Sequence, residues 1–380
     1  MQVKVIRGHF INELEQELSS IIHKEFTPSL AIVFCSASQN INQLKTIFKE
    51  RSIKLAGVTT AGEIYHHTVD EKSIVAVLFD LDPSFFQLHF INNNERKIPL
   101  YELGKEVALL AKDQFSDSSL ILFSGGLKRD GEQLVKGVKE IKLDGLNVYG
   151  ALAGDDLNMK DTYVFNEDTI TNDGVLALAI DNNEVDVQGT AISGWESIGT
   201  EKTITRAREN VVFSIDNVPA VDIFMEYFNK PKERLQQKDM IVTELSQYPL
   251  QVLRDDGTFV LRAPLMADVD RGALIFSGGV EEGSRIKFSV PPGFETIETT
   301  INEISKLKQN IPEADVLLMF SCKARHQALG PLLEEEIGGI QHIWNAPLGG
   351  FFSYGEIGSF KQNSCDFHNE TVTLIVIKGK

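Results

Sequence analysis

Runs of apolar residues recur along the chain in a fixed order with glycine-rich turns. Three runs have the length of strands buried on both faces of a sheet, at residues 30–34, 120–123 and 316–320. Each run ends in small residues and is followed by a helix-compatible stretch, a glycine turn and a second apolar run. These second runs lie at residues 73–79, 174–180 and 371–377. The pattern predicts an α/β fold with internally repeated strand–helix–glycine turn–strand units.

The stretch between the second and third units has a different pattern. Short runs such as residues 185–193 and 285–290 predict a series of strands, and residues 294–307 predict a helix before the third unit. No proline- or serine-rich linker separates these parts. We therefore predict two lobes of mixed β-sheet with flanking helices: an N-terminal α/β domain over residues 1–216 and a C-terminal α/β domain over residues 217–380.

Small residues at the ends of the buried strands mark a candidate cleft. In open α/β sheets, ligands bind beyond the carboxyl ends of the strands. The third unit is marked best, because its first strand ends in Ser321-Cys322 and its turn ends in Gly355-Glu356. In the second unit, Ser124 and Gly125 end the strand and begin a loop that could hold an anion, without the spacing of a phosphate-binding loop.

Arg325 is a candidate for binding an anion. It follows the third buried strand where a helix is expected to begin, and its planar guanidinium suits a carboxylate or a phosphate. The alternative is a surface ion pair with the acidic cluster at residues 334–336. Arg325 and Glu334 are nine residues apart, more than two helical turns, so we do not expect a direct pair within one straight helix.

Three acids follow the glycine turns and are candidates for accepting a ligand ammonium group. They are Glu63, Asp155 and Glu356, which would occupy equivalent positions if the units are symmetric. Glu356 is the first choice, because it belongs to the best-marked unit. The alternative is that each acid caps the following turn, a frequent role for such residues.

Cys322 has two interpretations. It could be a nucleophile if His326 or His368 activates it, or a buried structural thiol. Tyr354 has a polar tip that suits the rim of a pocket. Asn369 could donate a hydrogen bond to a ligand or hold the neighbouring turn in place, and the sequence leaves both open.

Charge and cysteine usage limit the partners and the compartment. A net charge of −17 argues against nucleic acid and against an anionic membrane surface. The three cysteines have no CxxC spacing, so we expect a reducing, cytoplasmic setting. There is no signal-peptide pattern at the N-terminus and no run of about 18–20 apolar residues. His66-His67 has no matching ligand cluster and no cofactor motif is found, so we expect neither a metal nor a cofactor.

The third unit resembles the C-terminal half of the FIST sensory domain family. The resemblance lies in residues 320–325, 347–357 and 367–371, and residues 57–63, 123–125 and 150–155 are similar to the N-terminal half. It covers nearly the whole chain. It implies an intracellular sensory module that binds small ligands, with amino acids suggested, and that is often fused to a signalling output.

We therefore predict a non-enzymatic sensory module that binds an amino acid or a small carboxylate in a cleft between the lobes and signals through a separate protein. The predicted ligand-binding residues are Cys322, Arg325, Tyr354, Gly355, Glu356, His368, Asn369, Ser124, Gly125, Glu63 and Asp155. The alternative is a thiol-dependent hydrolase or transferase that uses Cys322 with His326 or His368.

Overall fold

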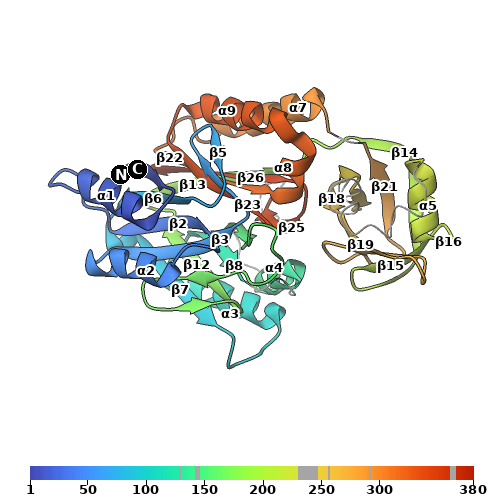
Figure 1. Ribbon diagram of the computed structural model, residues 1–380, viewed down its shortest axis with the longest axis horizontal. Helices are drawn as coiled ribbons and strands as arrows, with labels where there is room; N and C mark the ends of the chain where they lie inside the picture. The colour runs from blue at the N-terminus through green and yellow to red at the C-terminus, as the bar shows by residue number, and fades with distance from the viewer. Residues whose placement is uncertain are drawn as a thin grey trace.

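The computed structural model describes residues 1–125, 127, 130–141, 146–229, 247–255, 257–290, 292–359 and 365–380. It shows mixed sheets with flanking helices, which confirms the predicted α/β class (Figure 1). None of the described helices is long and apolar enough to cross a membrane.

Three of the four sheets contain the same core of four strands. In each, a parallel pair is extended by two antiparallel strands on one side. The first core is β1 (Gln2–Gly8), β6 (Ile74–Asp80), β2 (Leu30–Ser36) and β3 (Lys54–Thr60). The second is β7 (Phe86–Asn92), β12 (Gly174–Asp181), β8 (Ser118–Ser124) and β9 (Asn147–Leu152). The third is β13 (Val185–Ile192), β26 (Val372–Gly379), β22 (Val316–Cys322) and β23 (Leu348–Ser353).

Each of these sheets is completed by a strand from another unit. After the first glycine turn, β4 (Glu63–Tyr65) pairs with β23, and β5 (Thr68–Asp70) pairs with β4 to complete a hairpin. After the second, β10 (Val164–Phe165) pairs with β3 and carries β11 (Ile170–Thr171). After the third, β24 (Glu356–Gly358) pairs with β9 and carries β25 (Asp366–His368). The hairpins are thus exchanged in a cycle among the three sheets.

A common core lies between the inner faces of the three sheets. Its centre holds one phenylalanine from each first strand, Phe34, Phe123 and Phe320, with ring centroids 5.4–6.3 Å apart. Phe351 of β23 joins them, 5.1 Å from Phe34. All four rings are fully buried. Edge-to-face packing of this kind stabilises a core beyond the area that it buries.

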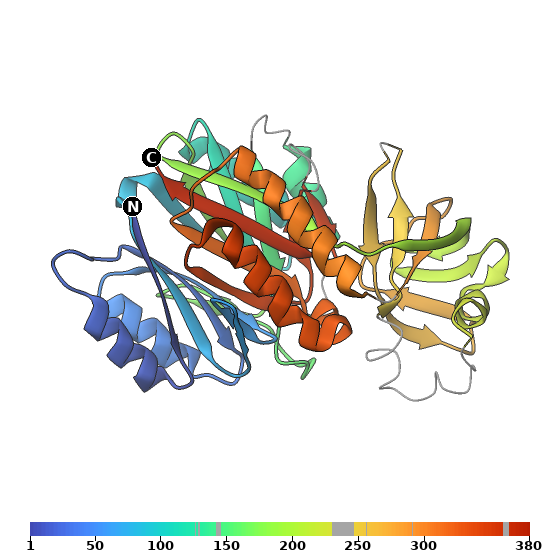
Figure 2. The same cartoon turned by 90° about the horizontal axis from the view of Figure 1, so that it is seen from above.

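A pair of helices covers the outer face of each sheet (Figures 1 and 2). The pairs are α1 (Ile11–Ile21) with α2 (Ile41–Glu50), α3 (Leu100–Gln114) with α4 (Gly131–Glu140), and α7 (Phe294–Ser305) with α9 (Leu333–Trp344). A Cβ at Gly104 of α3 would lie 2.1 Å from the Leu134 carbonyl oxygen of α4, so glycine permits this close crossing. Shorter helices are α8 (Lys323–Leu329), η1 (Pro83–Phe85), η4 (Lys306–Gln309) and η5 (Gly330–Leu332).

The fourth sheet lies at the end of the molecule opposite the two chain termini (Figure 1). Its strands are β14 (Ser197–Arg208), β15 (Val211–Ile215), β16 (Val218–Pro219), β17 (Leu250–Leu253), β18 (Phe259–Arg262), β19 (Pro264–Asp268), β20 (Ala273–Phe276) and β21 (Arg285–Ser289). They enclose a separate core with α5 (Ala220–Tyr227). We call the described parts of 1–193 and 294–380 the α/β body.

The boundary predicted between residues 216 and 217 falls within this fourth sheet, in the turn between β15 and β16. Both residues adopt left-handed backbone conformations there, with φ of 50° and 65°. The boundary stays a prediction. In the structure, the sheets combine segments from both predicted domains, as β4 and β23 show.

Candidate functional site

A cavity of about 340 Å³ lies between the α/β body and the fourth sheet. We call it the strand-end cavity, because the last residues of β8, β22 and β23 form part of its wall. Its volume is at the small end of the range of ligand pockets, about 300–1,000 Å³. It is lined by Ser124, Leu127, Leu152, Ala153, Leu157, Met159, Thr162, Ala263, Pro264, Leu265, Met266, Ser277, Cys322, Lys323, Ala324, Gln327, Ser353, Tyr354 and Asn369.

The fourth sheet reaches the cavity where β18 passes into β19. The side chain of Arg262 is buried at this point and donates to Glu132 of α4, at 2.9 Å, and to the carbonyl oxygen of Phe367, at 3.1 Å. These bonds anchor the fourth sheet to the α/β body. A register shift in the pairing of β19 with β20 follows Pro264, so the consecutive residues Leu265 and Met266 both remain exposed at the rim.

Four of the predicted ligand-binding residues line the cavity: Ser124, Cys322, Tyr354 and Asn369. Ser124 and Cys322 end β8 and β22, and Asn369 precedes β26. Asn369 is buried and its Oδ1 accepts a hydrogen bond of 2.6 Å from the Ser277 hydroxyl of the fourth sheet. The amide therefore holds the neighbouring segment in place at the wall of the cavity, which is one of its two predicted roles.

The environment of Cys322 favours a protonated thiol. Burial raises its pKa well above the ordinary range, and the nearby carboxyls of Glu356 and Glu370 raise it further. His326, one of the two residues that could activate the thiol, has its Nδ1 3.2 Å from the Nζ of Lys323. His368 is buried in β25, with Nε2 3.2 Å from the Gly358 carbonyl oxygen. Because a thiolate is the nucleophilic form of cysteine, these surroundings do not support the thiol-enzyme alternative.

Arg325 is fully buried and pairs with Glu336 of the acidic cluster, whereas the alternative interpretation placed such a pair at the surface. The helix is interrupted at Gly330, between α8 and α9, because a right-handed helix cannot include a residue with a φ of 54°. The change of direction brings α9 back over Arg325. The guanidinium also donates to the carbonyl oxygens of Ser193 and Glu370 and to the Thr300 hydroxyl. All five of its N–H groups are thus occupied within the protein.

Glu356 is also fully buried, and it lies behind the wall of the cavity. Its carboxylate accepts hydrogen bonds from the Ser353 hydroxyl, at 2.5 Å, and from the Thr371 hydroxyl, at 2.8 Å. Burial raises its pKa to about 8. Glu63 is bound in the same way by Thr60 and Ser73, and burial raises its pKa to about 7.

Asp155 has a different role from these two glutamates. It is buried, and its carboxylate accepts from the backbone N–H groups of Met159 and Lys160, at 3.1 and 2.6 Å, so it caps the following turn. It also accepts a hydrogen bond of 2.6 Å from the Tyr354 hydroxyl. Asp155 therefore shapes the rim of the cavity from behind. Capping is the alternative that the sequence left open.

The remaining predicted residues, Gly125 and Gly355, permit close packing near the cavity. A Cβ at Gly355 would lie 2.4 Å from the ring of Phe367, and one at Gly125 would lie 3.1 Å from the Thr162 carbonyl oxygen. Their effect is on the shape of the strand ends. Whether any of the predicted residues binds a ligand stays a prediction.

Sequence reasoning missed the wall that the fourth sheet contributes. No element was predicted at residues 263–266, and nothing local indicates that they face the ends of β8 and β22. The exposed apolar pair Leu265-Met266 was an available signal, because strands with one solvent face usually alternate. Gln327 was also missed, although it lies on the predicted helix two residues after Arg325.

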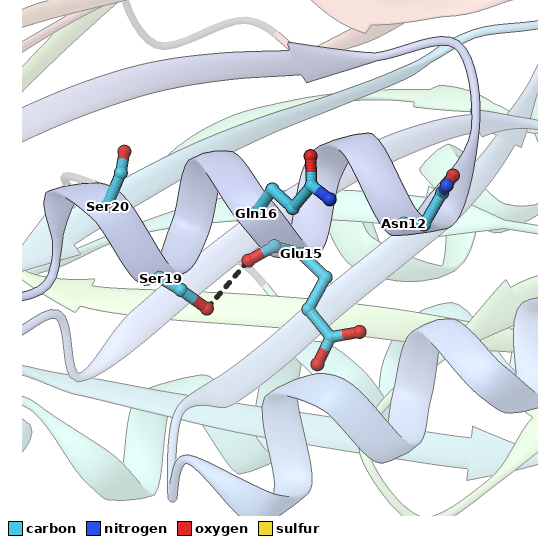
Figure 3. Close-up of a pocket in the computed structure, with 5 residues that line it drawn as sticks. All are labelled: Asn12, Glu15, Gln16, Ser19 and Ser20. Carbon is cyan, nitrogen blue, oxygen red and sulfur yellow. Dashed lines mark hydrogen bonds between the residues drawn. The ribbon is translucent and has the colours of Figure 1, made fainter.

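A second hollow, of about 550 Å³, lies along the exposed face of α1 (Figure 3). It is lined by polar residues of this one helix, namely Asn12, Glu15, Gln16, Ser19 and Ser20. The Ser19 hydroxyl donates to the Glu15 carbonyl oxygen, a bond within the helix. A single polar helix face offers no enclosed surface to a ligand, so the strand-end cavity is the better candidate. Among the described residues, no cluster of His, Cys, Asp or Glu could hold a metal ion.

These features define a class: a mixed α/β protein with a small, mainly apolar cavity at its strand ends. The sequence profile of the FIST N domain matches residues 29–218, and that of the FIST C domain matches residues 220–359. The chain belongs to the FIST family, as its motifs suggested. FIST domains are associated with sensory signal transduction.

The chain is also similar to two mycobacterial proteins over most of its length. The uncharacterized protein Rv0628c of Mycobacterium tuberculosis is 24% identical over 355 residues, which cover 87% of each chain. The uncharacterized protein Mb0898c of Mycobacterium bovis is 23% identical over 309 residues, which cover 77% of this chain and 74% of that protein.

Proposed function

We propose that this protein is a sensory module that binds a small molecule in the strand-end cavity and passes the signal to a separate protein. The observation that carries the proposal is the composition of the cavity wall. One side comes from the α/β body, at Cys322 and Tyr354, and the other from the fourth sheet, at Pro264 and Leu265. A ligand there would contact both parts at once.

Contact with both parts gives a ligand a way to signal. If a ligand binds one arrangement of the fourth sheet and the α/β body more tightly than another, it shifts the population toward that arrangement. Arg262 and the Ser277–Asn369 hydrogen bond couple the two parts beside the cavity. The family's association with sensory signal transduction supports this proposal.

A thermal-shift screen tests the proposal. Amino acids, small carboxylates and neutral apolar compounds are added to the whole protein, and the unfolding midpoint is followed. A ligand at 100 times its dissociation constant adds about 2.7 kcal/mol to the free energy of unfolding.

Two variants of α8 locate the binding. Ala324 lines the cavity, whereas Ala328 lies on the same helix outside it. Ala324→Leu should abolish the response by filling the cavity, and Ala328→Leu should leave it intact. A flat response across a broad panel, or a response that both variants retain, would contradict a sensory role for this cavity.

A further inference from the structure

We propose that the ligand is a compact, uncharged and largely apolar molecule with one hydrogen-bond-accepting end, and that the amides of Asn369 and Gln327 bind that end. This inference rests on the proposed function, because it names the ligand class of the same cavity. It departs from the amino acid or small carboxylate that the sequence suggested.

The walls of the cavity favour an apolar ligand. Leu127, Leu152 and Leu157 line it on the side of the α/β body, and Pro264 and Met266 line it on the side of the fourth sheet. A charged group that enters such a space loses its hydration, so it binds only where the protein supplies an opposite charge.

Among the described residues, no such charge is free at the cavity. Lys323 is the one charged residue among the described residues that line it. Its Nζ lies 3.4 Å from a carboxylate oxygen of Glu71 and 3.2 Å from His326 Nδ1, and 5.6 Å from the centre of the Phe352 ring. These three partners lie outside the cavity lining, so the ammonium group is directed away from the cavity.

The charged groups that a zwitterion would need are also committed elsewhere. All five donors of Arg325 are occupied by the protein, chiefly by Glu336. Glu356, predicted to accept an ammonium group, is bound by Ser353 and Thr371 behind the wall. Within the described part of the chain, an amino acid in the cavity would therefore find no free partner for either of its charges.

Most hydroxyl groups at the wall have no hydrogen left to donate. A hydroxyl carries a single donor. The hydroxyl of Tyr354 donates to Asp155, that of Ser124 donates to the Gly174 carbonyl oxygen, and that of Ser277 donates to Asn369. These groups hold the wall together and cannot donate to a ligand at the same time.

Among the described residues, two side-chain amides remain as donors. Asn369 is 2% exposed, and its Oδ1 is occupied by Ser277, which leaves its Nδ2 group. Within the part of the chain that the structure describes, neither this group nor the amide of Gln327 has a hydrogen-bond acceptor in the protein. A carbonyl oxygen on the ligand would accept a hydrogen bond from these donors at the cavity wall. The pair of amides thus selects an acceptor on an uncharged molecule.

Four probes that share one branched five-carbon chain test this class: isocaproamide, isocaproate, leucine and isoamylamine. Their heads are neutral, anionic, zwitterionic and cationic. Titration calorimetry at neutral pH measures the dissociation constant of each with the whole protein. We expect isocaproamide to bind at least about tenfold more tightly than the three charged probes, because each of these buries an unpaired charge.

Variants identify the side chains that bind the polar end of the ligand. Asn369→Asp keeps the oxygen that Ser277 binds but replaces the N–H donor with an acceptor, so isocaproamide should lose about tenfold in affinity and isoamylamine should gain. Gln327→Met removes the other amide, keeps the side chain at nearly the same length and introduces no charge. It therefore tests the role of the amides even if Asn369→Asp unfolds the protein. Ala324→Leu should abolish binding of every probe, and Ala328→Leu should not.

The outcomes separate this inference from the proposed function. Tighter binding of leucine or isocaproate, abolished by Ala324→Leu, would keep the cavity as the sensory site and overturn the uncharged ligand class. Binding of isocaproamide that survives both Asn369→Asp and Gln327→Met would overturn the role of the amides. Failure of all four probes would overturn the ligand class as stated, while the broader thermal-shift screen decides the sensory role separately.

Discussion

Glu63 and Glu356 occupy equivalent positions in two different sheets and accept the same set of hydrogen bonds. Each receives one bond from a hydroxyl three residues earlier, Thr60 or Ser353, and two from a residue at the start of the closing strand, Ser73 or Thr371. Each glutamate begins the strand that passes to another sheet. The two carboxyls therefore hold the points at which hairpins are exchanged.

The pKa of Glu356 predicts a pH dependence of stability. Burial raises this pKa from its ordinary value of 4.5 to about 8, against a smaller lowering by its hydrogen bonds and Arg325. Between these values the unfolded chain loses the proton and the folded chain keeps it, so the contribution of Glu356 to the free energy of unfolding should fall as pH rises from about 4.5 to 8. Urea midpoints measured across this interval check the direction.

Glu356→Gln should flatten this dependence. A glutamine can fill the site without a proton to lose, because the Ser353 hydroxyl can accept from its amide. Burial and the charge of Glu356 also raise the pKa of Glu370, and burial raises that of Glu63 to about 7, so part of the slope belongs to these two carboxyls. Glu335→Gln, on the exposed side of α9, is the control and should keep the full slope. A pH profile unchanged in Glu356→Gln would contradict the assignment.

The ion pair between Arg325 and Glu336 should be critical to stability. Both side chains are fully buried, so Glu336→Ala leaves an unpaired guanidinium and should cost about 3–5 kcal/mol in urea unfolding. Glu335→Ala, one residue earlier and exposed, should stay within about 0.5 kcal/mol of the wild type. Replacing both partners with methionine should recover much of the loss, and a double variant as unstable as Glu336→Ala would contradict this account.

The central phenylalanine cluster predicts an equally large effect at a site remote from the cavity. Phe320 contacts Phe34, Phe123 and Phe351 with ring centroids 5.2–5.9 Å apart. Phe320→Ala should lower the free energy of unfolding by about 3–5 kcal/mol, through lost burial and the cavity left behind. Phe294→Ala is the matched control, because that ring is 60% exposed. Equal effects of the two changes would contradict a shared core for the three sheets.

Cys322 should react slowly in the native protein. Its raised pKa and its burial both oppose thiolate formation. Iodoacetamide at neutral pH should therefore label it no faster than Cys35 or Cys365, which are also buried, and all three should react once urea unfolds the chain. Mass spectrometry of timed samples provides the measurement. Fast and selective labelling of native Cys322 would revive the thiol-enzyme alternative.

The sequence was most informative where the structure depends on local pattern. The apolar runs at residues 30–34, 120–123 and 316–320 lie within β2, β8 and β22, because a run of this length fits a strand that is buried on both faces. The three acids after the glycine turns also showed where the turns end. Only Glu63 and Glu356 proved equivalent, whereas Asp155 caps a turn that its own unit requires.

What the sequence could not show are contacts between distant segments. The pairing of β4 with β23 joins residues nearly 290 positions apart, as in Tyr65 with Gly349, and no local signal selects that partner. The position of Arg325 depends on the interruption of the helix at Gly330, and the pattern of charged residues gave no sign of that interruption. The apolar wall at Leu265 is a property of how the fourth sheet is seated against the α/β body, so it appears only in three dimensions.

The cyclic exchange of hairpins has a consequence for the ancestry of the protein. A gene fragment encoding one unit would yield a sheet with an unpaired edge strand and a hairpin without the sheet that it normally joins. Unpaired edge strands promote aggregation. Deleting, duplicating or moving a single unit would leave a strand of another unit without its pairing partner. We therefore expect this architecture to be inherited whole, with diversity confined to the loops and to the fourth sheet.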